Sequence, residues 1–255
     1  MNLKGMDILQ THFPDLGTPS GRLRIASLFL FWFGFVTTYF ILSDNIPTWS
    51  IDSQILILTI GFLVISQFFS RRLAYQKKFG ERAYRNATLH FLIPGLGFIF
   101  AAVIHAAYMN SPFVPRGWWT TLFQLLGIWL LASGLVLWMR AILTFGVDNL
   151  LLAHVYHPGD GPLMNSEIYE ILRHPIYAGV LRVIFGLALL NGNANSLAFI
   201  PFAPLGFTGW IRLVEERELI ERFGNDYLEY RRRVPAFWIK FTAIPAYLRI
   251  LFKGS

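Results

Sequence analysis

Two short stretches of the chain combine residue types that could bind a charged ligand. The first, RHPIYAG, runs from Arg173 to Gly179 and places an arginine and a histidine directly before an apolar segment. The second begins with two consecutive carboxylates, Glu215 and Glu216, at the far end of the next apolar segment. Arginine and histidine bind anionic groups and carboxylates bind cations. The two stretches together suit a ligand that carries both charges, such as an amino acid zwitterion.

Rules for helix ends predict how these stretches meet. Pro175 suits the first position of a helix, so a helix should begin there with its free N–H groups and positive dipole end beside His174. The short turn NGNANS makes the following helix antiparallel. The end of that helix, at Glu215 and Glu216, then returns beside His174 with the opposite polarity. The sequence predicts a pocket with a positive corner facing a negative corner.

The composition indicates a membrane protein. Of the 255 residues, 55% are hydrophobic and only 15% are charged, against about 25% charged in ordinary soluble domains. A membrane span needs about 20 apolar residues. We therefore expect an all-α polytopic bundle with about six transmembrane helices, four clear spans and a tighter final hairpin, over Ile25–Leu42, Ile51–Phe69, Leu89–Tyr108, Trp118–Phe145, Ile176–Leu190 and Leu197–Val214.

The placement of the basic residues predicts the orientation. The net charge is +7. If the chain has six spans, the loops that carry most of the lysines and arginines all fall on one side of the membrane. Among basic residues, the loops on the opposite side hold only Arg116. By the positive-inside rule both termini are cytoplasmic. No soluble basic face remains, so we do not expect nucleic-acid binding. The chain has no cysteine, which excludes disulfides, thiolate metal sites and a cysteine nucleophile.

The same two stretches resemble a known signature. RHPxYxG followed by EExxLxxxFGxxYxxYxxxVPxF is similar to the pattern of integral-membrane methyltransferases of the isoprenylcysteine carboxyl methyltransferase and phospholipid methyltransferase superfamily. In this chain the second piece reads EERELIERFGNDYLEYRRRVPAF, from Glu215 to Phe237. The resemblance covers roughly residues 163 to 237. We expect one structural domain, with residues 1–115 as a transmembrane scaffold and residues 116–255 as a methyltransferase-like core with cytoplasmic amphipathic helices and an interfacial tail.

The resemblance implies a cofactor and roles for named residues. It implies S-adenosylmethionine at the cytoplasmic face and a lipophilic acceptor that enters from the bilayer. Position by position, the resemblance implies that the cofactor is bound by His174, Tyr177, Gly179, Glu215, Glu216, Tyr227 and Tyr230. The last two would pack a lid over it. Arg173 would orient a carboxylate of the cofactor or the acceptor. If the acceptor is an amine, Glu167, Glu170 or Tyr169 could help to remove its proton.

One stretch departs from the superfamily pattern. Where the superfamily often reads LVTSGPYRYVRHP, this chain reads LMNSEIYEILRHP, with Glu167, Ile168 and Glu170 in place of Gly, Pro and Arg. Tyr169 is kept. The two acids change the charge near the cofactor mouth, which leaves the acceptor open among a carboxylate, an amine and a thiol.

Two further features call for an interpretation. Arg182 lies two turns into a span, where a charge costs about 2.5–3.5 kcal/mol. We expect it to face the bundle interior and bind a glutamate or an acidic acceptor head group, although it could also reach the membrane surface. His154, His157 and Asp160 have a spacing that could bind a metal, but the loop offers no fourth ligand. We predict no metal site.

The sequence therefore predicts an S-adenosylmethionine-dependent methyltransferase that acts on a lipophilic small molecule or lipid. Membrane lipids and the acceptor are the expected partners, and the oligomeric state stays open. Two alternatives remain at this stage: a nicotinamide-dependent membrane reductase of the sterol reductase type, and a non-catalytic lipid-binding protein with the same fold.

Overall fold

The chain forms helices throughout the part that the structure describes. This computed structural model describes residues 4–46, 48–111, 114, 117–158 and 167–253, and no β-strand occurs among them. The long helices are α2 (Pro19–Ser43), α3 (Ser50–Ser70), α6 (Ile93–His105), α7 (Trp118–Phe145) and α10 (Pro175–Asn191). Helix α12 (Phe202–Trp210) is shorter but lies within the bundle. The short ones are α1 (Met6–His12), α4 (Arg72–Phe79), α5 (Ala83–Ala87), α8 (Val147–Leu150), α9 (Ala153–Tyr156), α11 (Ala194–Phe199), α13 (Glu216–Phe223), α14 (Asn225–Arg233) and α15 (Ile244–Lys253).

Two single-turn π-helices join shorter helices into longer rods. The segment Thr88–Leu92 continues α5 into α6, and Ile211–Glu215 continues α12 into α13. With these joints, five rods are long and apolar enough to cross a membrane: Pro19–Ser43, Ser50–Ser70, Arg72–His105, Trp118–Phe145 and Ala194–Phe223. Helix α10 is apolar but has only 17 residues. The expected all-α polytopic bundle is confirmed, with five full-length candidate spans and a shorter sixth helix.

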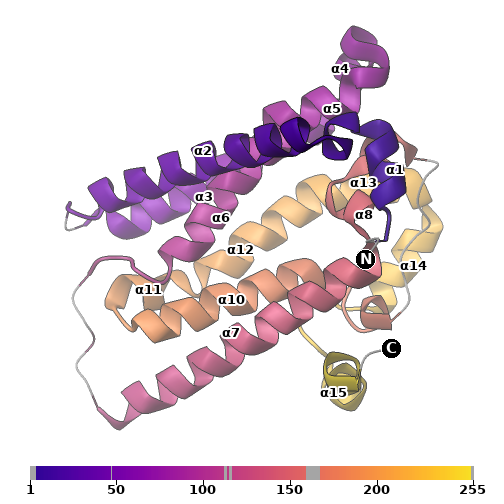
Figure 1. The fold of residues 1–255 in the computed structure, drawn as a ribbon. Coiled ribbons are helices and arrows are strands. Elements are labelled where there is room, and N and C mark those ends of the chain that lie inside the picture. The colour runs from indigo at the N-terminus through magenta and orange to yellow at the C-terminus, as the bar shows by residue number, and fades with distance from the viewer. Residues whose placement is uncertain (1–3, 47, 112–113, 115–116, 159–166, 254–255) are drawn as a thin grey trace.

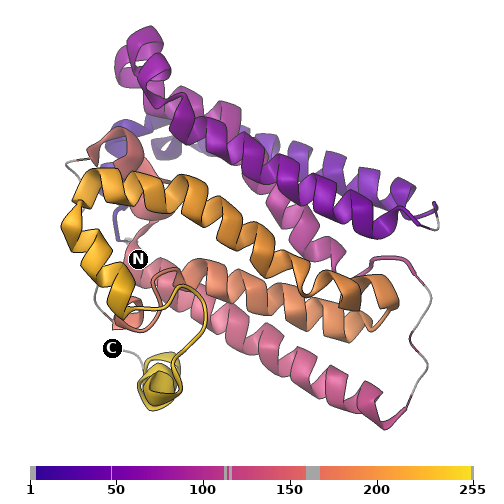
Figure 2. The same cartoon turned by 180° about the vertical axis from the view of Figure 1, so that it is seen from behind.

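The long helices form two groups that run side by side. Helices α2, α3 and α6 pack together, and α7 packs along α10, while α12 lies between the groups and contacts both α3 and α10 (Figures 1 and 2). Both ends of the chain lie at the same end of the molecule, near α8 and α14 (Figure 1). The turn between α10 and α11 lies at the opposite end.

Glycines bring α7 and α10 into close contact. A Cβ atom on Gly179 of α10 would stand 2.9 Å from the carbonyl oxygen of Gly134 on α7. One further contact repeats this seven residues along each helix, where a Cβ atom on Gly186 would stand 2.8 Å from the carbonyl oxygen of Gly127. Small residues let two membrane helices approach this closely. The contact fixes the direction in which α10 presents its first turn.

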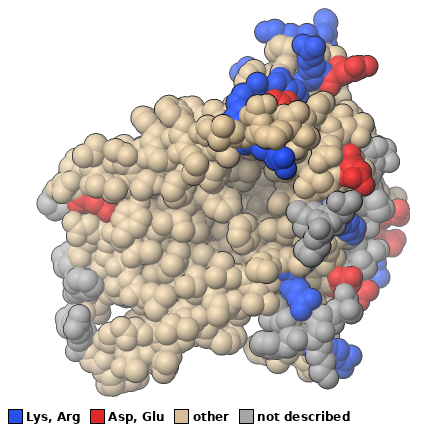
Figure 3. Space-filling model, in the orientation of Figure 1, with Lys and Arg blue, Asp and Glu red and all other residues tan. Residues whose placement is uncertain are grey.

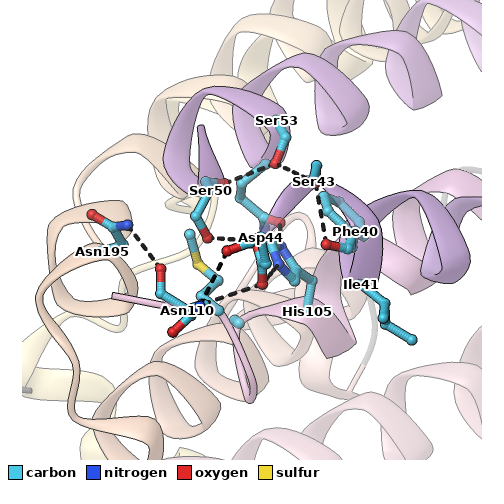
Figure 4. A network of polar contacts seen from close by, with 12 residues as sticks. Phe40, Ile41, Ser43, Asp44, Ser50, Ser53, His105, Asn110 and Asn195 are labelled. Atoms are coloured by element: carbon cyan, nitrogen blue, oxygen red, sulfur yellow. Dashed lines mark hydrogen bonds and ion pairs between the residues drawn. The ribbon is translucent and has the colours of Figure 1, made fainter. Parts of the chain in front are cut away.

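A buried polar network closes the end of the bundle opposite the termini (Figure 4). His105 is fully buried at the end of α6, with Nε2 3.0 Å from an Asp44 carboxylate oxygen and Nδ1 2.7 Å from the side-chain oxygen of Gln54. Asp44 also accepts hydrogen bonds from Ser50 and from the backbone N–H of Asn110. Polar groups inside a membrane protein need such partners. The network therefore ties α2, α3 and α6 together far from the site described below.

The basic side chains gather at the end that holds the termini. In Figure 3 the lysines and arginines cluster over α4 and around that end, whereas the long face seen in this view carries none. Exposed apolar side chains cover α2 and α7, among them Leu30, Phe31, Phe35, Leu125, Ile128 and Trp129. This distribution suits an integral membrane protein with several passes.

Candidate active site

The first turn of α10 and the last turns of the α12–α13 rod meet at the charged end of the molecule. His174 occupies the N-cap position of α10 and Pro175 the first position. The backbone N–H groups of Arg173 and His174 donate to the carbonyl oxygens of Pro235 (2.9 Å) and Ala236 (3.2 Å). The segment after α14 thus folds back over the start of α10 and fixes the backbone there.

Four side chains form a charged cluster at this junction: Arg173, His174, Glu215 and Glu216, hereafter the Arg-His-Glu cluster. His174 lies between the glutamates, with Nδ1 3.3 Å from Glu215 Oε1 and Nε2 3.3 Å from Glu216 Oε1. The predicted proximity of the histidine and the two acids is therefore present. The predicted geometry differs in one respect, because the two corners contact each other directly and do not face each other across an open gap.

The charges within the cluster support one another. Arg173 Nη2 lies 3.0 Å from Glu216 Oε1, and Arg231 of α14 lies 3.5 Å from the other carboxylate oxygen. Burial disfavours a charged imidazole, but hydrogen bonds to Glu215 and Glu216 and their negative charges outweigh it and raise the pKa of His174. A protonated His174 donates from both ring nitrogens, which matches the two carboxylates that it contacts.

The two glutamates have different surroundings. Glu215 lines a cavity and accepts a hydrogen bond of 2.5 Å from the hydroxyl of Tyr177. Glu216 is almost fully buried and does not line the cavity, since Arg173, His174 and Arg231 surround its carboxylate. Consecutive helical residues point about 100° apart, so both cannot face the same space. The π-turn that ends at Glu215 changes the local register, a feature common at functional sites.

Three tyrosines close the site on the side of α14. The hydroxyl of Tyr230 donates to the backbone carbonyl of Tyr169 at 2.7 Å, which links α14 to the segment before α10. Tyr169, Tyr227 and Tyr230 are all buried and line the cavity. Burial raises the pKa of each of the three phenols, so they remain protonated. Arg173 adds a bond from Nη1 to the carbonyl oxygen of Arg231 at 2.6 Å.

The cavity extends from the Arg-His-Glu cluster into the bundle. Its volume is about 260 Å³, close to the lower end of the range of about 300–1,000 Å³ for small-molecule sites. One end carries the polar residues named above. The other end is apolar and is built from α3, α6, α7, α10 and α12, with Phe62, Ile65, Leu96, Ile99, Trp138, Val180, Phe207 and Trp210. Residues of the first 115 positions therefore form part of the wall.

Besides Glu216, three predicted site residues lie outside the cavity wall. Gly179 packs against α7, as described above, and Arg182 donates to the carbonyl oxygen of Ala178 (2.8 Å) and lies 5.7 Å from the centre of the Tyr247 ring. Glu167 is exposed and accepts a hydrogen bond of 2.7 Å from Thr144. It adopts a left-handed backbone with φ of 53°, at the position where the superfamily pattern has glycine.

Of the three residues whose spacing could bind a metal, the structure describes only the two histidines. Asp160 lies outside the described residues. His154 is buried against Phe145, and the ring of His157 stacks on that of His12 at 3.6 Å. Within the described ranges, no group of three or more histidine or acidic side chains is arranged to hold a metal ion.

Among the polar residues of the cavity wall, His154 of α9 and Arg222 of α13 were not predicted to be part of the cofactor site. Arg222 follows Glu215 by seven residues, which is two helical turns, so helical spacing alone could have placed it on the same wall. The sequence singles out His154 only through its spacing to His157 and Asp160, and that spacing gives no reason to place it at the cofactor site.

Comparisons with known proteins bear on this arrangement. A family model described as phospholipid methyltransferase matches residues 122–226. That range contains α7, α10, α12 and α13 and the whole Arg-His-Glu cluster. Over this part, the chain is similar to that methyltransferase family. The match ends before Tyr227, so the tyrosines of α14 lie just outside it.

Three curated relatives carry methyltransferase names. The chain is 29% identical over 127 residues to protein-S-isoprenylcysteine O-methyltransferase B of Arabidopsis thaliana, covering 49% of this chain and 62% of that protein. It is 31% identical over 115 residues to protein-S-isoprenylcysteine O-methyltransferase of Saccharomyces cerevisiae, covering 45% and 48%. It is 41% identical over 71 residues to methanethiol S-methyltransferase 2 of Bradyrhizobium diazoefficiens, covering 27% and 25%.

The matched stretches thus span less than two thirds of these relatives. No solved structure matches this chain significantly.

Proposed function

We propose that this protein is a membrane methyltransferase that uses S-adenosylmethionine and methylates a lipophilic acceptor at the cytoplasmic face. The observation that carries the proposal is the Glu215 carboxylate on the cavity wall, held by Tyr177 and His174 at the point where a charged surface meets an apolar cavity. The family match over residues 122–226 and the methyltransferase names of the relatives support it.

The residues present fit a sulfonium cofactor. Glu215 would bind its cationic part, since one carboxylate oxygen faces Tyr177 and the group borders the cavity. Arg173 also lines the cavity, and its buried Nε has no hydrogen-bond partner, so it is available to a carboxylate. Tyr227 and Tyr230 would cover the ligand. When bound, S-adenosylmethionine supplies a methyl group on a positively charged sulfur.

The apolar end of the cavity suits the acceptor. Aromatic and aliphatic side chains from both halves of the chain line it, so residues 1–115 contribute to substrate binding in this proposal as well as to the scaffold. Membrane lipids or lipophilic small molecules are the matching class. The protein's part in an in-line displacement is to align the acceptor with the methyl group and to exclude water.

The site favours acceptors that need no base. Tyr169 borders the cavity, but burial, followed by the charge of Glu215, raises its pKa well above the ordinary value, so its hydroxyl donates and does not remove a proton. Glu167 lies outside the wall. A carboxylate is already ionised and can attack directly. A thiol and an ammonium group must each lose a proton first, and the thiol loses it more easily because its ordinary pKa is about 8.5, against about 10.4 for the amine. We therefore place the carboxylate and the thiol ahead of the amine.

Cofactor binding tests the proposal directly. We expect purified protein in lipid nanodiscs to bind S-adenosylhomocysteine by isothermal titration calorimetry, and Glu215→Gln and His174→Ala to weaken binding at least about tenfold, the effect of losing a charge-assisted contact. Arg217→Gln is the matched control, because Arg217 lies on the same helix and is exposed. Equal affinity in all four proteins, with unchanged tryptophan fluorescence melting, would refute the role of the cluster.

Methyl transfer tests the acceptor class. Labelled S-adenosylmethionine would be offered with a prenylated cysteine, a long-chain alkyl thiol or phosphatidylethanolamine. We expect transfer to the first or the second and none to the amine. Transfer to phosphatidylethanolamine alone would overturn the order of acceptors. Cofactor binding without transfer to any membrane lipid extract would favour a non-catalytic protein, and oxidation of a nicotinamide cofactor would favour a reductase.

A further inference from the structure

The cavity wall has a second polar corner, formed by His154 and Arg222, which the proposed function does not use. His154 comes from α9, in the loop between α7 and α10, and Arg222 comes from the last turn of α13. Both residues line the cavity. Neither falls on a fixed position of the two motifs that carry the family resemblance.

Helix geometry sets this corner apart from the Arg-His-Glu cluster. Glu215, Leu219 and Arg222 all line the cavity and follow one another by four and three residues, so they form one face of the α13 rod. Seven residues at 1.5 Å each place Arg222 about 10 Å beyond Glu215 along the axis. A ligand that reaches from one to the other is therefore extended, with an apolar contact at Leu219 between its ends.

His154 offers an imidazole that is buried and uncharged. It is 6% exposed, and its Nδ1 atom has no hydrogen-bond partner. Burial, followed by the positive charge of Arg222, lowers the pKa of His154 to about 3. A neutral imidazole presents one N–H donor and one bare nitrogen acceptor. A buried polar atom without a partner is unfavourable unless a ligand supplies one.

Arg222 offers donors whose charge is already balanced. Its Nε lies 3.4 Å from Glu218 Oε1, and Glu218 does not line the cavity. The guanidinium lies 4.3 Å from the centre of the Phe223 ring, and its Nη1 atom is buried without a hydrogen-bond partner. The corner therefore joins an N–H donor and a neutral imidazole with no net charge. A second carboxylate would be repelled by Glu218, whereas a neutral group with adjacent donor and acceptor atoms would not.

We propose that His154 and Arg222 recognise the base of the nucleoside-bearing methyl donor, with the imidazole accepting from the exocyclic amine and the guanidinium donating to a ring nitrogen. This inference rests on the proposed function and adds a specificity to it. Leu152, two residues before His154, and Leu219 and Phe223, on the helix of Arg222, also line the cavity and could supply apolar contacts for a flat ring. The amino acid end of the donor would then lie at Glu215, about 10 Å away.

The test compares two ligands that differ at the base edge. S-adenosylhomocysteine carries a 6-amino group beside an unprotonated ring nitrogen, and S-inosylhomocysteine carries a 6-oxo group beside a protonated one. The donor and acceptor positions are thus exchanged. We expect the unchanged protein to bind the adenosyl compound at least about tenfold more tightly, because the exchange leaves buried polar groups unpaired. His154→Phe and Arg222→Met should reduce this ratio to within about threefold.

The ratio of the affinities for the adenosyl and inosyl compounds, taken within each variant, separates base recognition from folding. A partly unfolded sample would bind both compounds more weakly by the same factor and keep the ratio. Arg217→Met is the control for Arg222→Met, because the side chain is exposed on the same helix and should keep the full ratio. If the unchanged protein binds neither compound, the proposed function itself is wrong. If it binds both equally, or if His154→Phe and Arg222→Met keep the full ratio, cofactor binding stands and the assignment of this corner is wrong.

Discussion

At the scale of residues, the site depends on one glutamate facing the cavity while its neighbour holds the wall. Glu215 borders the cavity and Glu216 is enclosed by Arg173, His174 and Arg231. Removing a partner from an enclosed carboxylate leaves a buried charge, which costs more than the bond itself was worth. Changes at Glu216 should therefore disturb folding, whereas changes at Glu215 should act first on ligand binding.

The protonation of His174 predicts how site stability depends on pH. Its pKa is raised in the folded protein above the ordinary value of 6.5. The stability that its pairs contribute is fully present below about pH 6.5 and is lost as the pH rises through the raised folded value. We expect His174→Gln to melt below the unchanged protein at pH 6, and the difference to shrink as the pH rises towards 9.

Tryptophan fluorescence melting of both proteins in detergent measures this difference, which cancels the titration of groups that the two proteins share. A difference that stays constant between pH 6 and pH 9 would show that the imidazole does not carry the charge.

The residues of the Arg-His-Glu cluster show which parts of the site were predictable from the sequence. The motifs predicted that His174 and the two glutamates meet, because helix polarity and a short turn suffice for that. They could not predict that the two corners pair directly, since side-chain rotamers decide it. Arg182 was expected at the bundle interior with an acidic partner, and it lies against Tyr247 of the tail. The fold of the tail, and with it this contact, is not encoded in local spacing.

At the scale of elements, the contact between α7 and α10 positions the site. The spans themselves were predictable from apolar length, and the end of the α13 helix at Gly224 was predictable from glycine. The π-turn before Glu216 and the short helices α8 and α9 were not, because tertiary packing determines them. The glycine contacts between α7 and α10 were not predictable either, because a small side chain in the sequence does not show which helix it packs against.

Gly179 tests the contact between these helices. In Gly179→Ala the new Cβ atom would stand 2.9 Å from the backbone oxygen of Gly134, which cannot move away without shifting α7. We expect a loss of about 1–3 kcal/mol, typical of overpacking, and a melting midpoint lower by several degrees. Gly209→Ala is the control, because a Cβ atom there has nothing within 4 Å. Equal melting of the two variants would show that the close approach is unimportant.

At the scale of the whole molecule, the fold separates two polar regions by the length of the bundle. The Asp44–His105 network lies at one end and the Arg-His-Glu cluster at the other, with both termini beside the cluster (Figures 1 and 4). Under the positive-inside rule, the excess of basic side chains at the cluster end predicts that this end faces the cytoplasm. S-adenosylmethionine is charged and water-soluble, so a site open to the cytoplasm is also what the proposed function requires.

The absence of cysteine from the chain makes this orientation testable with single cysteine variants. Arg217 lies on α13 at the cluster end and is exposed, and Thr48 lies in the turn between α2 and α3 at the opposite end and is also exposed. We expect a membrane-impermeant maleimide added to intact cells to label Thr48→Cys and to leave Arg217→Cys unlabelled until the membrane is opened. The reverse pattern would invert the topology and put the cavity mouth outside the cell, where the proposed cofactor is not supplied. Labelling of both variants from outside would mean that Thr48 and Arg217 lie on the same side of the membrane. The count of six passes would then be wrong.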